Sequence, residues 1–454
     1  MFGRHETIVE RGIVGRFPAF SLEASSLLTR TGVLGGGALG LTTALRLAQR
    51  GEEVVLFERE AAPGGLAAGF PLGPSHLEKF YHHLFRSDTQ AIALIEELGL
   101  GEKLVWPRPR TSTLVNGERH QLDSASTVLR FSPLPLIERL RLAAGLGYLR
   151  LEPNYHRLES ITADAWIRKW MGRRVYDIVW QPLLRSKFGD RYRDIAMSWF
   201  WARVHLRSSS LGYLRGGFQQ LYDALVERIR SLGGELHFGV EVQRIERDSS
   251  GAFHVTTSKG EFEFDRVVST LPTRLTIRLT PALEGEFAKQ YGDLESYGAQ
   301  CLILSLDRPL TDVYWLNIND PGYPFLALVE HTNYMPPEDY GGRHIVYFGN
   351  YLPMNHPLFL KSEEEVLAEF VPAIKRITPS FDESWITETR LFRAPFAQPI
   401  VTVGYPDRLP RHESPVPGLY LANVSQVYPQ DRGQNYSIAM ANRLVASLFP
   451  GTPQ

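Results

Sequence analysis

The sequence lacks the features of several large protein classes. Cys301 is its single cysteine, which excludes an internal disulfide and a cysteine-rich metal site and fits a reducing compartment. No apolar run reaches the roughly 18 residues of a membrane-spanning helix. Since 49 Lys and Arg face 50 Asp and Glu, no basic excess favours nucleic acid. We therefore expect a cytoplasmic protein of 454 residues, large enough for two domains, with no nucleic-acid partner and no metal.

A glycine-rich stretch lies near the amino end. A short apolar run precedes Gly35-Gly36-Gly37-Ala38-Leu39-Gly40, an apolar-periodic helix follows, and residues 54–57 form a second buried strand that ends at Glu58. Gly35 allows a tight turn, Gly37 lets the backbone approach a diphosphate, and Gly40 lets helix and strand pack closely. Glu58 is placed to accept hydrogen bonds from a ribose and would repel a 2′-phosphate. The stretch therefore predicts a dinucleotide site that does not take NADP.

A second glycine pair, Gly64-Gly65, follows Glu58, and NAD sites do not need it. Together these motifs resemble the amino-terminal signature of the FAD-dependent oxidoreductases that include flavin amine oxidases, protoporphyrinogen oxidases, phytoene desaturases and UDP-galactopyranose mutases. The resemblance implies FAD as the cofactor. It also implies an α/β fold, with a Rossmann-like FAD-binding domain of the glutathione-reductase type and a discontinuous, inserted α+β substrate domain.

The order of the motifs along the chain predicts the domain limits. We assign residues 28–100, 210–281 and 390–454 to the FAD-binding domain, and residues 101–209 and 282–389 to the substrate domain. Residues 1–27 mix charges with short apolar pieces, and we expect them to form a poorly ordered extension.

Two later motifs resemble the same family. Gly216-Gly217-Phe218, a helix and strands near Val242 match the segment that meets the adenine side of FAD. A strand that ends near Asn423 matches the last strand of the FAD domain, although Asn423-Val424 stands where the family has Gly-Asp. The following helix, led by Gly433, directs its positive end toward the flavin. The resemblance implies that FAD is bound by Gly35, Gly37, Ala38, Leu39, Gly40, Glu58, Arg59, Gly64, Gly65, Leu66, Val242, Asn423, Gly433, Gln434 and Asn435.

Three histidines occur among aromatic residues between His76 and Asp88. Within this stretch, residues 81–85 are similar to a mutase motif whose first histidine lies against the isoalloxazine, and this similarity indicates His83. The alternative is that the histidines and aromatics line a half-buried strand. A later set of side chains suits either an aromatic, phosphorylated or carboxylated substrate or a packed helix with a solvated face: Trp199, Trp201, Arg203, His205 and Arg207. Our candidate catalytic residues are His83, Tyr81 and Arg203.

Two further segments predict local structure in the substrate domain. Asn116-Gly117 indicates a hairpin turn between short strands within residues 104–122. Residues 133–151 are apolar with interspersed arginines, and we expect a helix there. That helix either faces the core of the substrate domain or lies as an amphipathic helix at a membrane surface.

The chemistry is open to three interpretations. Flavin amine oxidases usually place a lysine near flavin N5, and the corresponding strand, residues 298–306, has none. We therefore favour a dehydrogenase, oxidase or desaturase similar to protoporphyrinogen oxidase, which removes hydride from a bulky, largely apolar or aromatic small molecule. The alternatives are a non-redox flavin mutase of the UDP-galactopyranose mutase type, acting on a nucleotide sugar, and a flavin-binding protein without turnover. The oligomeric state stays open.

Overall fold

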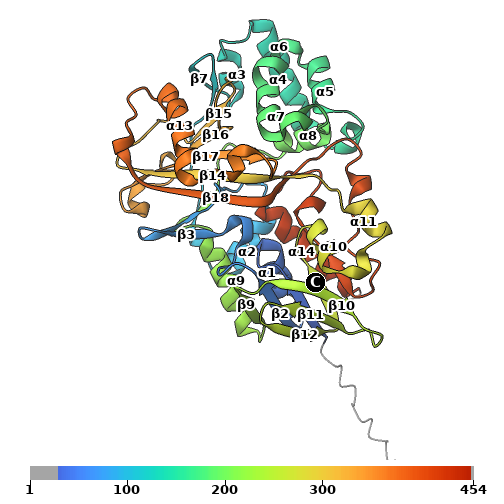
Figure 1. Cartoon of the computed structure of the whole chain (residues 1–454). Helices are drawn as coiled ribbons and strands as arrows, with labels where there is room; N and C mark the ends of the chain where they lie inside the picture. The colour runs from blue at the N-terminus through green and yellow to red at the C-terminus, as the bar shows by residue number, and fades with distance from the viewer. Residues whose placement is uncertain (1–28, 451–454) are drawn as a thin grey trace, which may run out of the picture.

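The computed structural model describes residues 29–450, and the predicted extension over residues 1–27 lies outside this part. Three groups of elements follow one another from bottom to top in Figure 1: a parallel sheet with its helices, a large and mainly antiparallel sheet, and a group of helices. None of the helices within residues 29–450 is both long and apolar enough to cross a membrane.

The parallel sheet has five strands, in the order β19-β13-β1-β2-β9. Their bounds are Arg30–Leu34 for β1, Glu53–Glu58 for β2, Glu235–Phe238 for β9, Arg266–Ser269 for β13 and Leu419–Leu421 for β19. The central strands β1 and β2 are almost continuously buried, because other layers cover both faces of the sheet. Continuous apolar runs are typical of such strands. The sheet therefore joins segments from both ends of the described chain.

Different layers cover the two faces of this sheet. Val33 and Leu56 pack against three helices: α1 (Ala38–Ala48), α9 (Gln219–Ser231) and α14 (Gln434–Leu448). Leu34 and Val55 pack against an antiparallel sheet of β10 (Val242–Arg247), β11 (Phe253–Thr257) and β12 (Gly260–Phe264). The predicted α/β fold class is confirmed.

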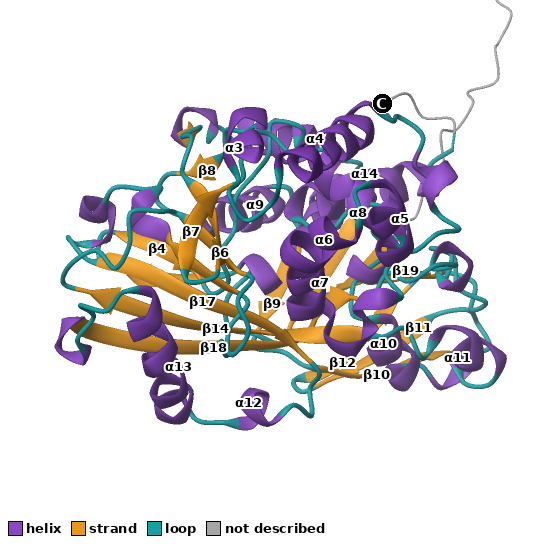
Figure 2. Ribbon diagram, turned by 90° about the horizontal axis from the view of Figure 1, so that it is seen from above, coloured by secondary structure: helices purple, strands orange, loops and turns teal. Residues whose placement is uncertain are grey.

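The larger sheet has seven strands, in the order β18-β14-β17-β16-β15-β6-β7, and only β15 and β6 are parallel neighbours. The long strands β14 (Ser296–Leu306), β17 (His344–Leu352) and β18 (Ile386–Pro399) lie side by side in Figure 2. The others are β6 (Thr111–Val115), β7 (Glu118–Gln121), β15 (Trp315–Ile318) and β16 (Ala327–Glu330), and α13 (Glu363–Ile377) packs on this sheet. The predicted turn at Asn116-Gly117 joins β6 to β7, with φ of 55° and 77°.

The predicted domain limit at residue 390 falls inside β18. This strand pairs with β14 as far as Pro399, so residues 390–399 belong to the seven-stranded sheet rather than to the FAD-binding part. We propose that the limit lies after Pro399, and the other predicted limits stay predictions.

The helical group between β7 and β8 (Tyr213–Leu214) has its own apolar core. Its elements are α3 (Ala125–Arg130), α4 (Leu136–Leu151), α5 (Ala163–Trp170), α6 (Arg173–Val175), a π-helical turn (Tyr176–Trp180), α7 (Gln181–Phe188) and α8 (Met197–His205). Leu142 and Leu149 of α4 are buried in this core, whereas Leu136, Ile137 and Leu151 are exposed. The helix predicted over residues 133–151 thus has both a core face and an apolar exposed face.

The remaining elements connect these layers. They are β3 (Gly69–Leu72) paired with β4 (Ser75–Glu78), β5 (Leu104–Val105) paired with β8, and the helices α2 (Thr89–Glu97), α10 (Thr273–Leu279), α11 (Glu286–Tyr291) and α12 (Pro357–Leu360). The alternative interpretation of the histidine stretch was a half-buried strand. Strand β4 ends at Glu78, so Tyr81 and His83 lie in the loop that follows it.

Candidate functional site

The turn between β1 and α1 is built for close approach of the backbone. Gly35 has φ +108°, and a Cβ there would lie 2.5 Å from Thr270 Oγ1. A Cβ on Gly40 would lie 1.8 Å from the carbonyl oxygen of Gly35. Helix α1 begins at Ala38, no side chain of the described residues caps it, and its first turn carries no acid. Its first N–H groups and its positive end are therefore available to an anion.

The second glycine pair lies directly against the first. Gly64 donates its backbone N–H to the carbonyl oxygen of Gly36 at 2.8 Å, and Gly37 and Gly64 form a parallel bridge. A Cβ on Gly65 would lie 3.1 Å from Cα of Gly37. The two motifs form one surface of bare backbone, which we call the glycine cradle (residues 35–40 and 64–65).

Glu58 closes one side of the glycine cradle. Its Oε2 accepts a hydrogen bond from the N–H of Gly36 at 2.6 Å, and its Oε1 accepts one from the N–H of Glu60 at 2.8 Å. A carboxylate has about four acceptor sites, so lone pairs remain for ribose hydroxyls. Next to it, Arg59 is exposed and pairs with Glu60.

Leu66 and Val242 are two further residues predicted to bind the cofactor. Leu66 is half-buried in the short 3-10 turn Gly65–Ala67 that follows the second glycine pair. Val242 is half-buried at the first position of β10, next to a register shift. The chain just before it is tied to Glu58, because Val240 donates its N–H to the Glu58 carbonyl oxygen at 2.9 Å.

Helix α14 presents a second free helix start. Gly433 is its N-cap residue, no side chain among residues 29–450 caps it, and its first turn has no acid. Gln434 Oε1 accepts a hydrogen bond from the Tyr222 hydroxyl at 2.6 Å. The Gln434 Nε2 group is buried and has no hydrogen-bond partner among the described residues. A ligand or a water molecule at this helix start would satisfy this donor.

The side chains of Asn423 and Asn435, which were predicted to bind the flavin, form hydrogen bonds with other protein groups. Asn435 Oδ1 accepts hydrogen bonds from the N–H groups of Gln90 and Ala91, at 2.9 and 3.1 Å, and so caps α2. The side chain of Asn423 caps a 3-10 turn, and its Nδ2 donates to Thr273 Oγ1 at 2.9 Å. What these two residues offer a cofactor is therefore mainly backbone.

The predicted catalytic residues Tyr81 and His83 lie among aromatic rings of the seven-stranded sheet. His83 Nδ1 lies 3.3 Å from the Tyr314 hydroxyl, and its ring meets Trp315 edge-to-face at 6.1 Å. Tyr81 meets Trp315 edge-to-face at 4.9 Å. Burial, followed by the charges of Arg207, His82 and Arg203, lowers the pKa of His83 to about 3. The His83 imidazole is therefore neutral near pH 7.

The loop of Tyr81 and His83 is attached to the glycine cradle. After the turn Gly65–Ala67 the chain forms the β3–β4 hairpin and returns, so that Lys79 donates its N–H to the carbonyl oxygen of Ala68 at 3.0 Å. The segment that carries the candidate catalytic residues thus begins where the glycine cradle ends.

Arg203, the third candidate, belongs to a charged group that the sequence did not reveal. Its guanidinium pairs with Asp431, and Lys187 Nζ lies 3.0 Å from the same carboxylate. Burial is the largest single effect on Asp431 and by itself would raise its pKa. The charges of Lys187, Arg203 and Arg432 together outweigh burial and hold the pKa of Asp431 well below its usual range. Burial lowers the pKa of Lys187 to about 7, against the opposite effect of Asp431. The position of Asp431 two residues before Gly433 was the one available signal.

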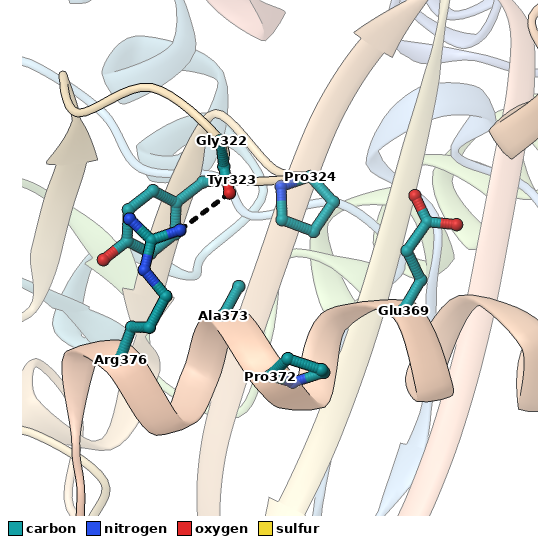
Figure 3. A pocket seen from close by; sticks show the side chains of 7 residues that line it. All are labelled: Gly322, Tyr323, Pro324, Glu369, Pro372, Ala373 and Arg376. Carbon is teal, nitrogen blue, oxygen red and sulfur yellow. Dashed lines mark hydrogen bonds between the residues drawn. The ribbon is translucent and has the colours of Figure 1, made fainter.

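A shallow surface depression lies elsewhere, between α13 and the loop around Tyr323 (Figure 3). The Arg376 guanidinium lies 4.0 Å from the Tyr323 ring centroid and donates to the Gly322 carbonyl oxygen at 2.8 Å. Its charged group is thus engaged with protein, and we assign it no chemistry. Within residues 29–450 no cluster of three or more His, Cys, Asp or Glu side chains is arranged to hold a metal ion.

The parallel sheet, the glycine cradle and the uncapped start of α1 together have the features of a dinucleotide-binding fold, in which a diphosphate lies at a helix start. The sequence matches the flavin containing amine oxidoreductase family over residues 40–429, and the chain belongs to that family. Its cofactor is FAD, and the family groups it with FAD-dependent oxidoreductases.

Individual relatives are distant. The chain is 26% identical over 247 residues to a 15-cis-phytoene desaturase of Glycine max. This match covers 48% of this chain and 43% of that protein. It is 24% identical over 305 residues to human protoporphyrinogen oxidase, covering 57% of this chain and 62% of that protein. The matched part thus spans less than two thirds of either relative. A reduced UDP-galactopyranose mutase shares the fold, with a TM-score of 0.75 and 16% identity over 94% of this chain and 96% of that one.

Proposed function

We propose that the protein is an FAD-dependent dehydrogenase, oxidase or desaturase that removes hydride from a bulky, largely apolar or aromatic small molecule. Bound FAD supplies the redox chemistry as hydride acceptor. The observation that carries the proposal is a set of rings around His83, which we call the aromatic wall (Tyr81, Tyr314 and Trp315). His83 and Tyr81 lie on the loop that is attached to the glycine cradle.

The chain's own residues have separate tasks in this proposal. The backbone of the glycine cradle and the start of α1 bind the diphosphate, and Glu58 binds the ribose. The aromatic wall orients an apolar substrate and excludes water. The neutral His83 imidazole holds one ring proton and leaves one ring nitrogen as an acceptor, so it orients the substrate without adding charge.

Anaerobic spectroscopy tests this function. The purified holoenzyme is mixed without oxygen with a panel of apolar and aromatic reduced compounds, and the visible absorption band of the flavin is followed. We expect bleaching with at least one compound, and regeneration of the band by an added electron acceptor. A protein that binds FAD and is bleached by none of a broad panel speaks against the proposal.

The mutase alternative is supported by the sequence of residues 81–85, which is similar to the mutase motif. The same experiment separates the two functions. A mutase converts a nucleotide sugar only after the flavin has been reduced with dithionite, whereas a flavin-binding protein without turnover shows neither bleaching nor conversion.

We further propose that the protein is cytoplasmic and touches a membrane surface through α4. Four apolar side chains of this helix are exposed: Leu136 by 63%, Ile137 by 65%, Leu140 by 49% and Leu151 by 82%. Arginines flank them, as in helices that lie in an interface. Co-sedimentation with anionic vesicles should fall when Leu136 and Ile137 are both replaced by Ser. Leu360→Ser, which changes a leucine of α12 that is 73% exposed, should bind as the wild type does.

A further inference from the structure

Asp431, two residues before Gly433, is surrounded by donors from other elements. Its Oδ2 accepts hydrogen bonds from Lys187 Nζ, at 3.0 Å, and from the Arg203 guanidinium. Its Oδ1 accepts hydrogen bonds from Trp199 Nε1 at 3.2 Å and from Gln398 Nε2 at 3.4 Å. A carboxylate has about four acceptor sites, so these four protein donors occupy the whole group.

The next residue, Arg432, has no acid of its own. Its Nε donates to Gln398 Oε1 at 3.2 Å, its other bond goes to the Tyr351 hydroxyl, and both acceptors are neutral. Among the described residues no carboxylate lies at ion-pair distance from Arg432. We call the group the basic cluster, and its members are Lys187, Arg203 and Arg432 around Asp431.

The charges of the basic cluster do not balance. Arginine is always charged in proteins, so the charge of Arg203 offsets that of Asp431 and the charge of Arg432 remains. Burial lowers the pKa of Lys187 to about 7, so this lysine adds to the surplus as the pH falls below that value. The side chains of Lys187 and Asp431 are 14% and 18% exposed, and salt screens charges weakly at such depth. The basic cluster therefore holds at least one uncompensated positive charge.

The chain itself keeps this charge close to the start of α14. Asp431 and Gly433 are two residues apart, so their Cα atoms are separated by at most about 7 Å. No side chain among residues 29–450 caps this helix, and its first turn has no acid, so the positive end of the helix is uncompensated as well. Both charges favour a negative charge on a group bound at this helix start.

The basic cluster also borders the aromatic wall. Arg432 Cζ lies 4.9 Å and Lys187 Nζ lies 5.0 Å from the Tyr351 ring centroid. Tyr351 and Gly349 are two residues apart on β17, so they face the same side of the sheet. A Cβ on Gly349 would lie 2.7 Å from the Tyr81 ring, which therefore lies directly over this glycine. The basic cluster thus adjoins both the start of α14 and the place proposed for the substrate.

We propose that the basic cluster raises the reduction potential of FAD whose ring system lies at the start of α14. Transfer of a hydride brings two electrons and one proton, so the ring system gains one negative charge, which nearby positive charge stabilises. Arg432 is the main contributor, because no carboxylate of the described residues offsets it. The inference rests on the proposed function and deepens it, because the cluster then makes FAD a stronger hydride acceptor.

Potentiometry tests the proposal without any substrate. The purified holoenzyme is titrated spectroelectrochemically against reference dyes, at neutral pH and constant ionic strength, and the midpoint potential of the two-electron couple is read from the flavin band. In Arg432→Gln the potential should fall by about 30 mV, which corresponds to a tenfold change in the equilibrium constant. Asp431→Asn removes the negative charge instead, so its potential should rise.

Two further variants separate charge from structure. Arg432→Lys loses the planar fork that reaches Gln398 and Tyr351 but keeps the charge, so its potential should stay close to that of the wild type. Arg228→Gln removes a charge on the exposed face of α9 and should leave the potential unchanged. A merely structural role of Arg432 would instead give equal shifts in Arg432→Gln and Arg432→Lys.

Three outcomes overturn the proposal. They are an unchanged or raised potential in Arg432→Gln, an unchanged or lowered potential in Asp431→Asn, and equal shifts in Arg432→Gln and Arg432→Lys. If the potentials shift as expected but no compound bleaches the flavin, the redox function fails and the effect of the basic cluster stands. If a compound bleaches the flavin and every variant keeps the wild-type potential, the effect of the basic cluster fails and the redox function stands.

Discussion

Gly64 and Gly36 are joined by a backbone hydrogen bond of 2.8 Å, so the second glycine motif closes directly on the first. The bond fixes the distance between the turn before α1 and the turn after β2. It explains in physical terms why a glycine pair beyond Glu58 accompanies this kind of site: side chains at these positions would separate two backbones that must touch.

We expect Gly64→Ala to lose FAD. Gly64 has φ +118°, where side chains are strained, and a Cβ there would lie 2.8 Å from Cα of Ala68. Strain of this kind costs about 1–3 kcal/mol, and the shift needed to relieve it would open the contact with Gly36. The absorption ratio of flavin to protein in the purified variant measures the loss. Gly147→Ala is the control, since that helical glycine has open space and the change should stabilise α4 by about 0.5–1 kcal/mol.

A second prediction concerns Glu58 and the adenosine half of the cofactor. Glu58→Gln keeps the size of the side chain but removes its charge and one acceptor, so we expect the affinity for FAD to fall by about tenfold. FMN lacks the adenosine ribose, and its affinity should stay the same. Fluorescence titration of the apoprotein with each flavin gives both values. Glu60→Gln, next to it on the surface, should leave both unchanged, and an equal loss for FMN would place Glu58 away from the ribose.

The buried amide of Gln434 leads to a third prediction. Tyr222→Phe removes the hydroxyl that donates to Gln434 Oε1 at 2.6 Å. Since Gln434 Nε2 already has no hydrogen-bond partner among the described residues, the whole amide group would then be without one. We expect the free energy of unfolding of the apoprotein to fall by about 1–3 kcal/mol, measured by urea titration. FAD affinity should fall as well, because the amide is no longer held in place.

Tyr297→Phe is the matched control for Tyr222→Phe. Its hydroxyl is also buried and donates to the Phe188 carbonyl oxygen at 3.1 Å, in a contact between β14 and α7 that does not include Gln434. This variant should lose stability without losing FAD affinity. If both variants bind FAD as the wild type does, the Gln434 amide does not face the cofactor.

Local patterns were sufficient for the parts of the fold that are contiguous in sequence. The turn at Gly35, the helix after it and β2 lie within one short stretch, and the Asn116-Gly117 turn determines its own hairpin. The helix that begins after Gly433 was instead predicted from the resemblance to the family. In each case the residues that determine the structure are neighbours along the chain.

The rest depends on contacts between distant residues. β4 ends at Glu78, whose carboxylate accepts hydrogen bonds from the Tyr213 hydroxyl at 2.8 Å and the Phe218 N–H at 2.6 Å, and no local pattern predicts that end. Lys187 and Asp431 meet only because α7 packs near the start of α14. The sequence therefore indicated the cofactor motifs but not the basic cluster.

The last prediction concerns His331, which is buried against aromatic rings. Its Nε2 lies 2.6 Å from the Tyr340 hydroxyl, and burial lowers its pKa to about 3. The unfolded chain has the ordinary value of about 6.5, so it binds a proton that the folded state refuses. This contribution to stability is present above pH 6.5 and is lost as pH falls toward 3. At pH 5 the loss is about 2 kcal/mol.

A variant comparison isolates this effect from an opposing one nearby. Burial raises the pKa of Glu78 to about 7, so its contribution is present below about pH 4.5 and is lost as pH rises through 7. Urea unfolding at pH 7.5 and 5.0 should show His331→Gln losing about 2 kcal/mol less on acidification than the wild type. Glu78→Gln should lose more than the wild type, because it lacks the compensating group. Parallel pH dependence in all three proteins would show that neither side chain changes its proton affinity on folding.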